Sequence, residues 1–390
     1  MFSWLRKAVS STPRSSPRPA RRMLEFERLE ERTVPAGVIA VGTGAGVAPL
    51  VALFHDTNND GVLDSAAFAV FPVLTPAFRG GVRVAVGHFT GTTTLQLVVA
   101  AGPGNAPMVQ VFQLNASDVP TGEVESFLAA GAGFRNGLFV ARAHTGGAAL
   151  DSLIVSADAG GAGFVKVYND GTAGDHLLAN SLVDAFLPFG AGYRGGVRVA
   201  ASRNLTGGAI SDSVALTTGP GIVSRVVILK DSNNNVVISD NLATREVLFP
   251  GGHSYKGGFF VAVGDVGSPS ANAELIVSKD AGSPPRVYIF ADTNNNGKYG
   301  DDVGPVASFL AFGADYRGGV RVAYSRLSPA AANLQAELMV APAFGRSPVK
   351  VFKAVSNGEI QPTTLPLAQF FPFGPNFTHG YFIAFGGNGS

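Results

Sequence analysis

The segment "DTNNDGVLD" at residues 56–64 carries an oxygen-bearing side chain at nearly every second position. In a tight loop such alternate residues converge on one point, and oxygens at this spacing are the ligands that calcium prefers. A glycine at the sixth position allows the sharp turn. The candidate ligands are Asp56, Asn58, Asp60, the carbonyl of Val62, and Asp64. The alternative is an Asn- and Asp-rich β-turn that binds no metal.

Two later segments repeat this pattern. The candidate ligands in "DTNNNGKYGDD" are Asp292, Asn294, Asn296, the carbonyl of Lys298, and Asp301 or Asp302. The segment "DSNNNVVISD", which begins at Asp231, has lost the glycine and is the weakest candidate. None of the three loops has a glutamate at position 12, so their affinity for calcium should be modest. Calcium that binds only the folded chain would raise its stability by mass action.

Arginine recurs inside an apolar phrase. The residues "YRGGVRVA" stand at 193–200 and again at 316–323, and "FRGGVRVA" at 78–85 differs in one residue. The second arginines of these copies are Arg83, Arg198 and Arg321, and three intervening copies have Phe139, Phe260 and Phe382 at the same place. A guanidinium can contact a phenyl face, or it can hold an anion such as sulfate, phosphate or an acidic sugar.

A third set of candidates lies ten residues after the aromatic that opens each copy of this phrase. The set contains His88, His144, Arg203, Asp265, Arg326 and Gly387. Histidine, aspartate and arginine on one rim could serve acid–base chemistry or hold a metal. Polar loop tips are the alternative interpretation, and no recognisable Ser/His/Asp spacing accompanies the set. The chain has no cysteine, which excludes thiolate nucleophiles and zinc–thiolate sites.

The elements that would position these residues form an internal repeat. Its six copies open at Phe78, Phe134, Tyr193, Tyr255, Tyr316 and Phe377. The starts are 56, 59, 62, 61 and 61 residues apart. Each interval holds short runs rich in Val, Ile and Phe between turns of Gly, Pro, Asn and Asp, and no window has a sustained helical period. Four antiparallel strands per unit, repeated in a ring, predict an all-β, six-bladed β-propeller.

The two ends of the repeat region are expected to share one blade. The sixth copy supplies only a first strand, and residues 38–54 match the second and third strands of a blade. Pairing of 381–385 with the strand that begins near Val38 would close the ring and remove its exposed edges. The arginine strand is then innermost. The three arginines would either make contacts between blades or, with donors facing the channel, form an anion site.

Charge divides the chain into two parts. Residues 1–36 hold eight Lys/Arg and four Asp/Glu, a net charge of +4, and are predicted to be a basic, disordered tail. Residues 37–390 hold 21 and 24, a net charge of −3, and are predicted to be the propeller. A near-neutral ring argues against nucleic acid as a partner. Glycines and Pro49 interrupt the uncharged stretch 36–54, and no other stretch qualifies as a membrane-spanning helix, so no transmembrane segment is expected. We expect a monomer.

The phrases "GGVRVAVG", "LVVAAGPGNAPMVQVF" and "GGFFVAVGDVG" resemble the FG-GAP/VCBS-type repeats of bacterial extracellular propellers, distant relatives of the integrin alpha propeller. The tail segment "FERLEERTVPA" at residues 26–36 resembles a sorting segment of the LERLEERTVPA type that is found ahead of such repeats. The resemblance implies an exported or cell-surface protein that binds a protein or glycan ligand. Family members usually place a calcium loop between the first and second strands, where only Asp265 keeps a ligand here, and integrin propellers have seven blades.

Two functions follow from these observations. The first is a non-catalytic extracellular or cell-surface propeller for ligand binding, adhesion or envelope structure, stabilised by calcium. The second is a secreted hydrolase or lyase with its site in the polar set at the channel mouth. Changing His88, His144 and Asp265 together would abolish the activity of an enzyme and leave a binding protein intact.

Overall fold

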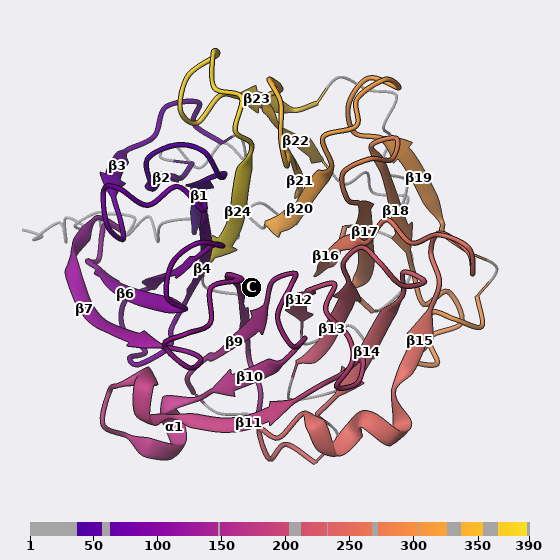
Figure 1. Cartoon of the computed structure of the whole chain (residues 1–390), viewed down its shortest axis with the longest axis horizontal. Helices are drawn as coiled ribbons and strands as arrows, with labels where there is room; N and C mark the ends of the chain where they lie inside the picture. Colours follow the sequence, from indigo (N-terminus) through magenta and orange to yellow (C-terminus); the bar gives the residue numbers. More distant parts are fainter. Residues whose placement is uncertain are drawn as a thin grey trace, which may run out of the picture. The chain divides into compact units, whose positions relative to one another are not determined.

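The computed structural model describes residues 37–56, 63–146, 149–202, 212–231, 233–266, 272–302, 304–325, 337–353 and 366–387. They belong to the second of the two units into which the chain divides, residues 35–390. Six four-stranded antiparallel sheets are arranged as blades around a central channel (Figure 1). This arrangement confirms the six-bladed all-β propeller that the repeat predicts.

Each blade runs outward from the channel through four strands. The first, innermost strands are β4 (Val82–Gly87), β8 (Leu138–Ala143), β12 (Val197–Ser202), β16 (Phe259–Gly264), β20 (Val320–Ser325) and β24 (Tyr381–Gly386). The second strands are β5 (Gln96–Ala101), β9 (Ser152–Ala157), β13 (Ser213–Thr218), β17 (Glu274–Lys279), β21 (Glu337–Pro342) and β1 (Val38–Thr43). The third strands are β6 (Met108–Leu114), β10 (Val165–Tyr168), β14 (Val226–Lys230), β18 (Arg286–Phe290), β22 (Val349–Lys353) and β2 (Leu50–Phe54). The fourth, outer strands are β7 (Pro120–Leu128), β11 (Leu182–Phe186), β15 (Glu246–Leu248), β19 (Ala307–Leu310), β23 (Ala368–Phe370) and β3 (Ala69–Pro72).

The closing blade combines strands from both ends of the propeller. Strand β24 pairs antiparallel with β1, with Val38 opposite Gly386 and Thr43 opposite Tyr381. The pairing predicted for these segments is therefore confirmed. Because β24 completes the sheet of β1, β2 and β3, neither β1 nor β24 is left as an unpaired edge.

The hydrophobic core is divided among six clusters, each of which is filled mainly from two adjacent blades. In one cluster, Val38 and Leu53 of the closing blade pack with Val82 and Leu97 of the next blade. Each fully buried apolar side chain of this kind contributes about 1.5–3 kcal/mol. Because every cluster needs both of its blades, the stability of one blade depends on its neighbours.

A tight glycine turn leads into each first strand. The second glycine of the turn has a positive φ, for example 84° at Gly81 and 83° at Gly319, where side chains are disfavoured. A Cβ at Gly81 would also lie 2.9 Å from the backbone nitrogen of Ala45 in the neighbouring blade. The hydroxyl of Tyr193 donates to the carbonyl of Gly196 at 2.8 Å and braces the equivalent turn. The phrase recurs because each blade makes the same close approach to its neighbour.

The connections between strands lie on two faces. We call one of them the basic face, for the charges described below; the structure describes its connections throughout, as 44–49, 73–81, 102–107, 129–137, 158–164, 187–196, 219–225, 249–258, 280–285, 311–319, 343–348 and 371–380. The opposite, acidic face carries the connections between first and second strands and between third and fourth strands. Antiparallel order in every blade fixes this division.

Helical structure in the described residues is confined to three short segments. They are α1 (Asp170–Ala173) and the 3-10 helices η1 (Leu178–Asn180) and η2 (Ser239–Thr244). All three lie in connections of the acidic face. Within the described part of the chain, no helix combines the length and the apolar character that crossing a bilayer would need.

Candidate functional site

The arginines and phenylalanines of the innermost strands meet at the basic-face end of the channel. The Cζ atom of Arg83 lies 4.4 Å from the ring centroid of Phe382 and 5.2 Å from that of Phe139. Arg198 lies between Phe139 and Phe260, with centroid distances of 5.3 and 5.0 Å. A guanidinium within about 6 Å of a ring is attracted by its negative face. Each arginine therefore links its own blade to the blades on both sides.

Arg321 completes the ring with a different geometry. Its Cζ lies only 3.4 Å from the ring centroid of Phe382 and 5.6 Å from that of Phe260. Its Nη1 donates to the carbonyl of Tyr381 at 2.8 Å. The six side chains thus alternate around the channel, and each guanidinium contacts two phenyl rings.

Two of the three guanidinium groups are neutralised by buried aspartates of the next blade. The Nη2 of Arg83 pairs with Oδ2 of Asp158 at 2.5 Å, and that of Arg198 pairs with Oδ2 of Asp280 at 2.6 Å. The arginines are each 6% exposed and the aspartates 9% exposed, so these pairs are largely removed from water. Burial lowers the pKa of Arg83, and the charge of Asp158 opposes that shift.

Among the residues that the structure describes, Arg321 has no such partner, because a glycine replaces the aspartate. The backbone N–H of Asp158 donates to the carbonyl of Gly137, and at the equivalent place in the closing blade Gly44 donates to Gly380. A Cβ at Gly44 would collide with the carbonyl oxygen of His379. An aspartate therefore cannot occupy this position with the backbone as it stands.

A second substitution keeps Arg321 from folding back as the other two arginines do. The Nη1 atoms of Arg83 and Arg198 sit where a Cβ at Gly102 or Gly219 would be. From there they donate to the carbonyls of Gly80 and Gly195 at 2.8 and 3.2 Å.

The residue equivalent to Gly102 and Gly219 in the blade of Arg321 is Ala343, whose backbone N–H donates to the carbonyl of Gly319. The methyl group of Ala343 occupies the space that the other guanidinium groups use. Arg321 therefore extends over the Phe382 ring.

The ring encloses a cavity of about 80 Å³. Its lining consists of Arg83, Arg198, Arg321, Phe139, Phe260, Phe382 and the Val or Ile that follows each of them. Three guanidinium groups and two carboxylates leave one positive charge. Burial, and next the charge of Arg83, lower the pKa of Arg321 to about 9. The arrangement can attract a small anion.

The polar set predicted at the other mouth is only partly described by the structure. Arg203 and Arg326 lie outside the described residues, and Asp265 is exposed. The backbone N–H of His88 donates to Asp151 at 2.8 Å, and that of His144 donates to Asp212 at 2.6 Å. These contacts join adjacent blades. They were not foreseen because the two aspartates precede second strands, one blade further along the chain.

The two aspartates differ in their electrostatics. Burial raises the pKa of Asp212 to about 6, against the opposing effect of the His144 N–H. Burial also acts to raise the pKa of Asp151, but contacts with His144 and Arg142 outweigh it and bring the value to about 2. The Nε of Arg142 lies 2.8 Å from Asp151. Asp212 and Arg142 line a second cavity of about 150 Å³ together with Ser202 and Tyr324.

Of the expected calcium loops, the one that begins at Asp292 is almost wholly described. The carboxylate of Asp292 is fully buried and accepts the backbone N–H groups of Asn296 at 3.0 Å and Gly297 at 2.6 Å. The backbone N–H of Lys298 donates to the Asn296 side chain at 2.9 Å, and the Asn296 amide donates to Asp301 at 2.7 Å. Of the remaining candidate ligands, Asn294 accepts the backbone N–H of Asn296 at 3.0 Å, and Asp302 accepts that of Thr293 at 3.3 Å.

The structure says less about the other two candidate calcium loops. Asn58, Asp60 and Val62 lie outside the described residues, whereas Asp56 and Asp64 lie within them. In the loop from Asp231, the sixth position is valine, and Val236 has a φ of 70°, which a β-branched residue rarely adopts.

Across the described residues, no three His, Asp or Glu side chains are clustered as they would be around a metal ion. The loop of Asp292 relies on asparagine and carbonyl oxygens, which calcium also accepts. Its donor set is therefore compatible with calcium.

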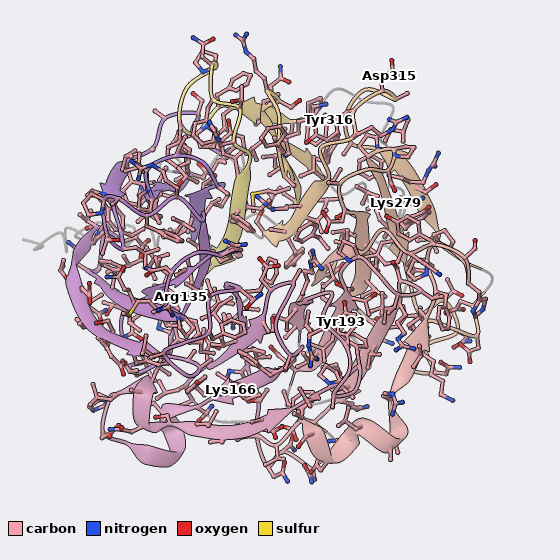
Figure 2. All side chains as sticks on the ribbon, viewed as in Figure 1. Arg135, Lys166, Tyr193, Lys279, Asp315 and Tyr316 are labelled. Atoms are coloured by element: carbon pink, nitrogen blue, oxygen red, sulfur yellow. The ribbon has the colours of Figure 1, made fainter. Side chains whose placement is uncertain are left out.

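A ring of cations on the basic face was not predicted. It consists of the residue that follows the opening aromatic of five blades: Arg79, Arg135, Arg194, Lys256 and Arg317. All five are exposed, and each arginine among them donates through Nη1 to carbonyls of its own turn. Figure 2 shows Arg135 and Tyr193, from different blades, on opposite sides of the centre of the view. The sequence signal was the basic residue that follows the opening Phe or Tyr in five of the six copies.

The two faces carry opposite charge. The basic-face connections also contain Arg225 and Arg346, and their acids are Asp158 and Asp280, paired in the channel, and Asp315. The described connections of the acidic face contain Asp56, Asp64, Asp118, Asp151, Asp170, Asp175, Asp212, Asp231, Asp240, Asp265, Asp292, Asp301 and Asp302, against Arg245 and Lys298. The net charge of the propeller thus hides a marked separation of charge between its faces.

Comparison with known proteins adds little to the fold. Neither a protein-family model nor a curated protein matches the chain. A solved structure of a protein from Lactobacillus plantarum is 12% identical with a TM-score of 0.47, and the match covers 86% of this chain and 82% of that one. A eukaryotic initiation factor is 11% identical with a TM-score of 0.33, and the match covers 87% of this chain and 64% of that one.

Proposed function

We propose that the propeller is a non-catalytic binding module of the cell exterior whose basic face receives an acidic ligand. The ring of five exposed cations defined above carries this proposal. It repeats around the face at one structural position, and the turn carbonyls hold its guanidinium groups in place. Ordered cations on one face attract an anionic partner and orient its approach.

The cell-surface location and the kind of partner rest on the resemblance to FG-GAP/VCBS-type repeats. That resemblance favours a protein or glycan ligand, and the basic face favours one that carries carboxylate or sulfate groups. Calcium in the loops at Asp56 and Asp292 would stabilise the acidic face by neutralising part of its charge. The sorting-type segment in residues 1–36 is consistent with export.

Binding to an acidic polysaccharide tests the proposal directly. Immobilised polygalacturonate should retain the protein, and neutral dextran should not. The combined substitutions Arg79→Gln, Arg194→Gln and Arg317→Gln should weaken binding about tenfold, at about 0.5 kcal/mol per exposed charge. The matched control, Lys298→Gln, removes a cation from the acidic face and should leave binding unchanged.

Equal retention on the neutral matrix, or full binding by the triple variant, would contradict the proposal. Pull-down from intact cell envelopes, with and without a chelator, then identifies the natural partner and its calcium dependence. Capture of an acidic protein would name a protein ligand, and capture of polysaccharide would name a glycan.

One observation favours the alternative of a secreted hydrolase or lyase. Asp212 has a raised pKa, an Oδ1 atom without a hydrogen-bond partner in the described structure, and a place in the wall of the 150 Å³ cavity. Such a carboxyl could act as a general acid near neutral pH. Polysaccharide cleavage that Asp212→Asn abolishes, with binding retained, would establish this second function.

A further inference from the structure

The channel ring contains one guanidinium whose charge is not matched. Arg83 and Arg198 each face an aspartate, whereas the equivalent position opposite Arg321 is Gly44. Nη1 of Arg321 donates to the carbonyl of Tyr381, and neither Nε nor Nη2 has an acceptor among the described residues. Arg321 is partly buried, and a partly buried cation without a matching charge is costly unless an anion joins it.

We propose that Arg321 binds a small anion in the channel cavity: an inorganic anion of a few atoms or a carboxylate group. The Nε and Nη2 atoms form the edge of the guanidinium that presents two parallel donors. The Phe382 ring lies against the flat face of the guanidinium and fixes its plane. The cavity of about 80 Å³ accepts an ion or a carboxylate, but not a whole sugar.

The site is confined to one third of the ring. At Arg83 and Arg198 the aspartates already occupy Nη2, so an anion there would meet a carboxylate at close range. The three-arginine site considered from the sequence is thereby reduced to a single arginine. The site is independent of any ligand on the basic face, and either proposal can fail without the other.

Thermal unfolding in bromide and in acetate tests the proposal and separates its two sources of anion. The wild-type melting temperature should rise and saturate as either salt is added, because an anion that binds only the folded state stabilises it. In Arg321→Met the saturating part of the rise should disappear. The control variant Arg245→Met removes an exposed cation of the acidic face and should keep the rise.

A response to acetate alone identifies a carboxylate ligand, and a response to bromide alone identifies an inorganic anion. No response to either salt, or the same saturating response in Arg321→Met, overturns the proposal. General salt effects are common to both proteins and cancel in the comparison.

Diffraction from wild-type crystals soaked in bromide gives a measurement that needs no variant. An anomalous peak within hydrogen-bond distance of Nε and Nη2 of Arg321 is expected. Bromide at Arg83 or Arg198 instead, or an empty channel at saturating bromide, overturns the proposal even if Arg321→Met fails to fold.

Discussion

Removing an arginine from the channel ring should destabilise the protein strongly at one position and very little at the symmetry-related one. In Arg198→Met, Asp280 is left buried without its partner, and breaking a buried pair from one side destabilises by about 3–5 kcal/mol. In Arg321→Met no carboxylate is left behind. We therefore expect Arg198→Met to be clearly destabilised and Arg321→Met to unfold close to wild type in buffer without binding anions.

The surroundings of Arg321 determine how much Arg321→Met changes the free energy of unfolding. Burial and Arg83 lower its pKa from 12.5 to about 9, which at about 1.36 kcal/mol per unit corresponds to about 5 kcal/mol. Arg321 keeps some exposure to the channel, so screening reduces this penalty to a few kcal/mol. The contacts with Phe260 and Phe382 and the bond to Tyr381 contribute a similar amount in the opposite direction. The burial penalty of Arg321 and the stabilisation from its contacts therefore cancel to within about 2 kcal/mol.

Differential scanning calorimetry measures the contrast. A ring of about 350 residues unfolds with an entropy of about 0.7 kcal/mol/K, so 3–5 kcal/mol lowers the melting temperature by about 4–7 °C. Adding Asp280→Asn to Arg198→Met should recover much of that loss, because the unpaired charge is removed. Equal losses in Arg198→Met and Arg321→Met, or no recovery in the double variant, would refute the assignment of charges in the ring.

Three further outcomes are expected. Millimolar calcium should raise the melting temperature, and Asp301→Asn should reduce the rise because one carboxylate of the loop is lost. A melting curve that calcium leaves unchanged would contradict calcium binding. Deleting 377–390 removes β24 and exposes β1, so the protein should aggregate in size-exclusion chromatography, and a soluble monomer of parental stability argues against the closure. Burial raises the folded-state pKa of Asp212, so the free-energy cost of its buried charge is absent below about pH 4 and complete above about pH 6. In urea unfolding, Asp212→Asn should therefore be more stable than wild type by up to about 3 kcal/mol at pH 7 and equally stable at pH 4. A stability difference that does not change with pH would contradict this.

The fold was predictable because it depends on information that lies along the chain. The sixfold recurrence of an aromatic residue followed by one or two glycines marks each turn into a first strand. The match of 38–54 to second and third strands led directly to the pairing of β1 with β24. The alternation of arginine and phenylalanine also predicted the order of side chains around the channel.

The partners of those side chains were not predictable from the same pattern. Asp158 lies 75 residues from Arg83, and Asp280 lies 82 residues from Arg198. A signal existed, since both aspartates follow a second strand and precede Ala-Gly, but nothing in the sequence says that a guanidinium reaches them. Whether the guanidinium folds back depends on the side chain of the residue that follows the second strand, such as Ala343, and the sequence does not show that the two meet.

The partners of the polar set at the channel mouth were likewise not predictable from the sequence. Counting ten residues from each aromatic places His88 and His144 correctly at the acidic-face end of the first strands. Their chemistry is decided by Asp151 and Asp212, which hold the backbone N–H groups and bridge to the next blade. A count along one blade cannot identify a partner that the following blade supplies.

The break in the threefold pattern lies where the two ends of the propeller meet. Arg321 belongs to the last blade formed by a continuous segment, and its Nη1 donates to Tyr381, the first residue of the closing strand. The carbonyl of His379, which excludes a side chain at Gly44, belongs to the turn into that same strand. The approach that closes the ring therefore also removes the third carboxylate. One guanidinium is left open to an anion at the junction on which the closure of the propeller depends.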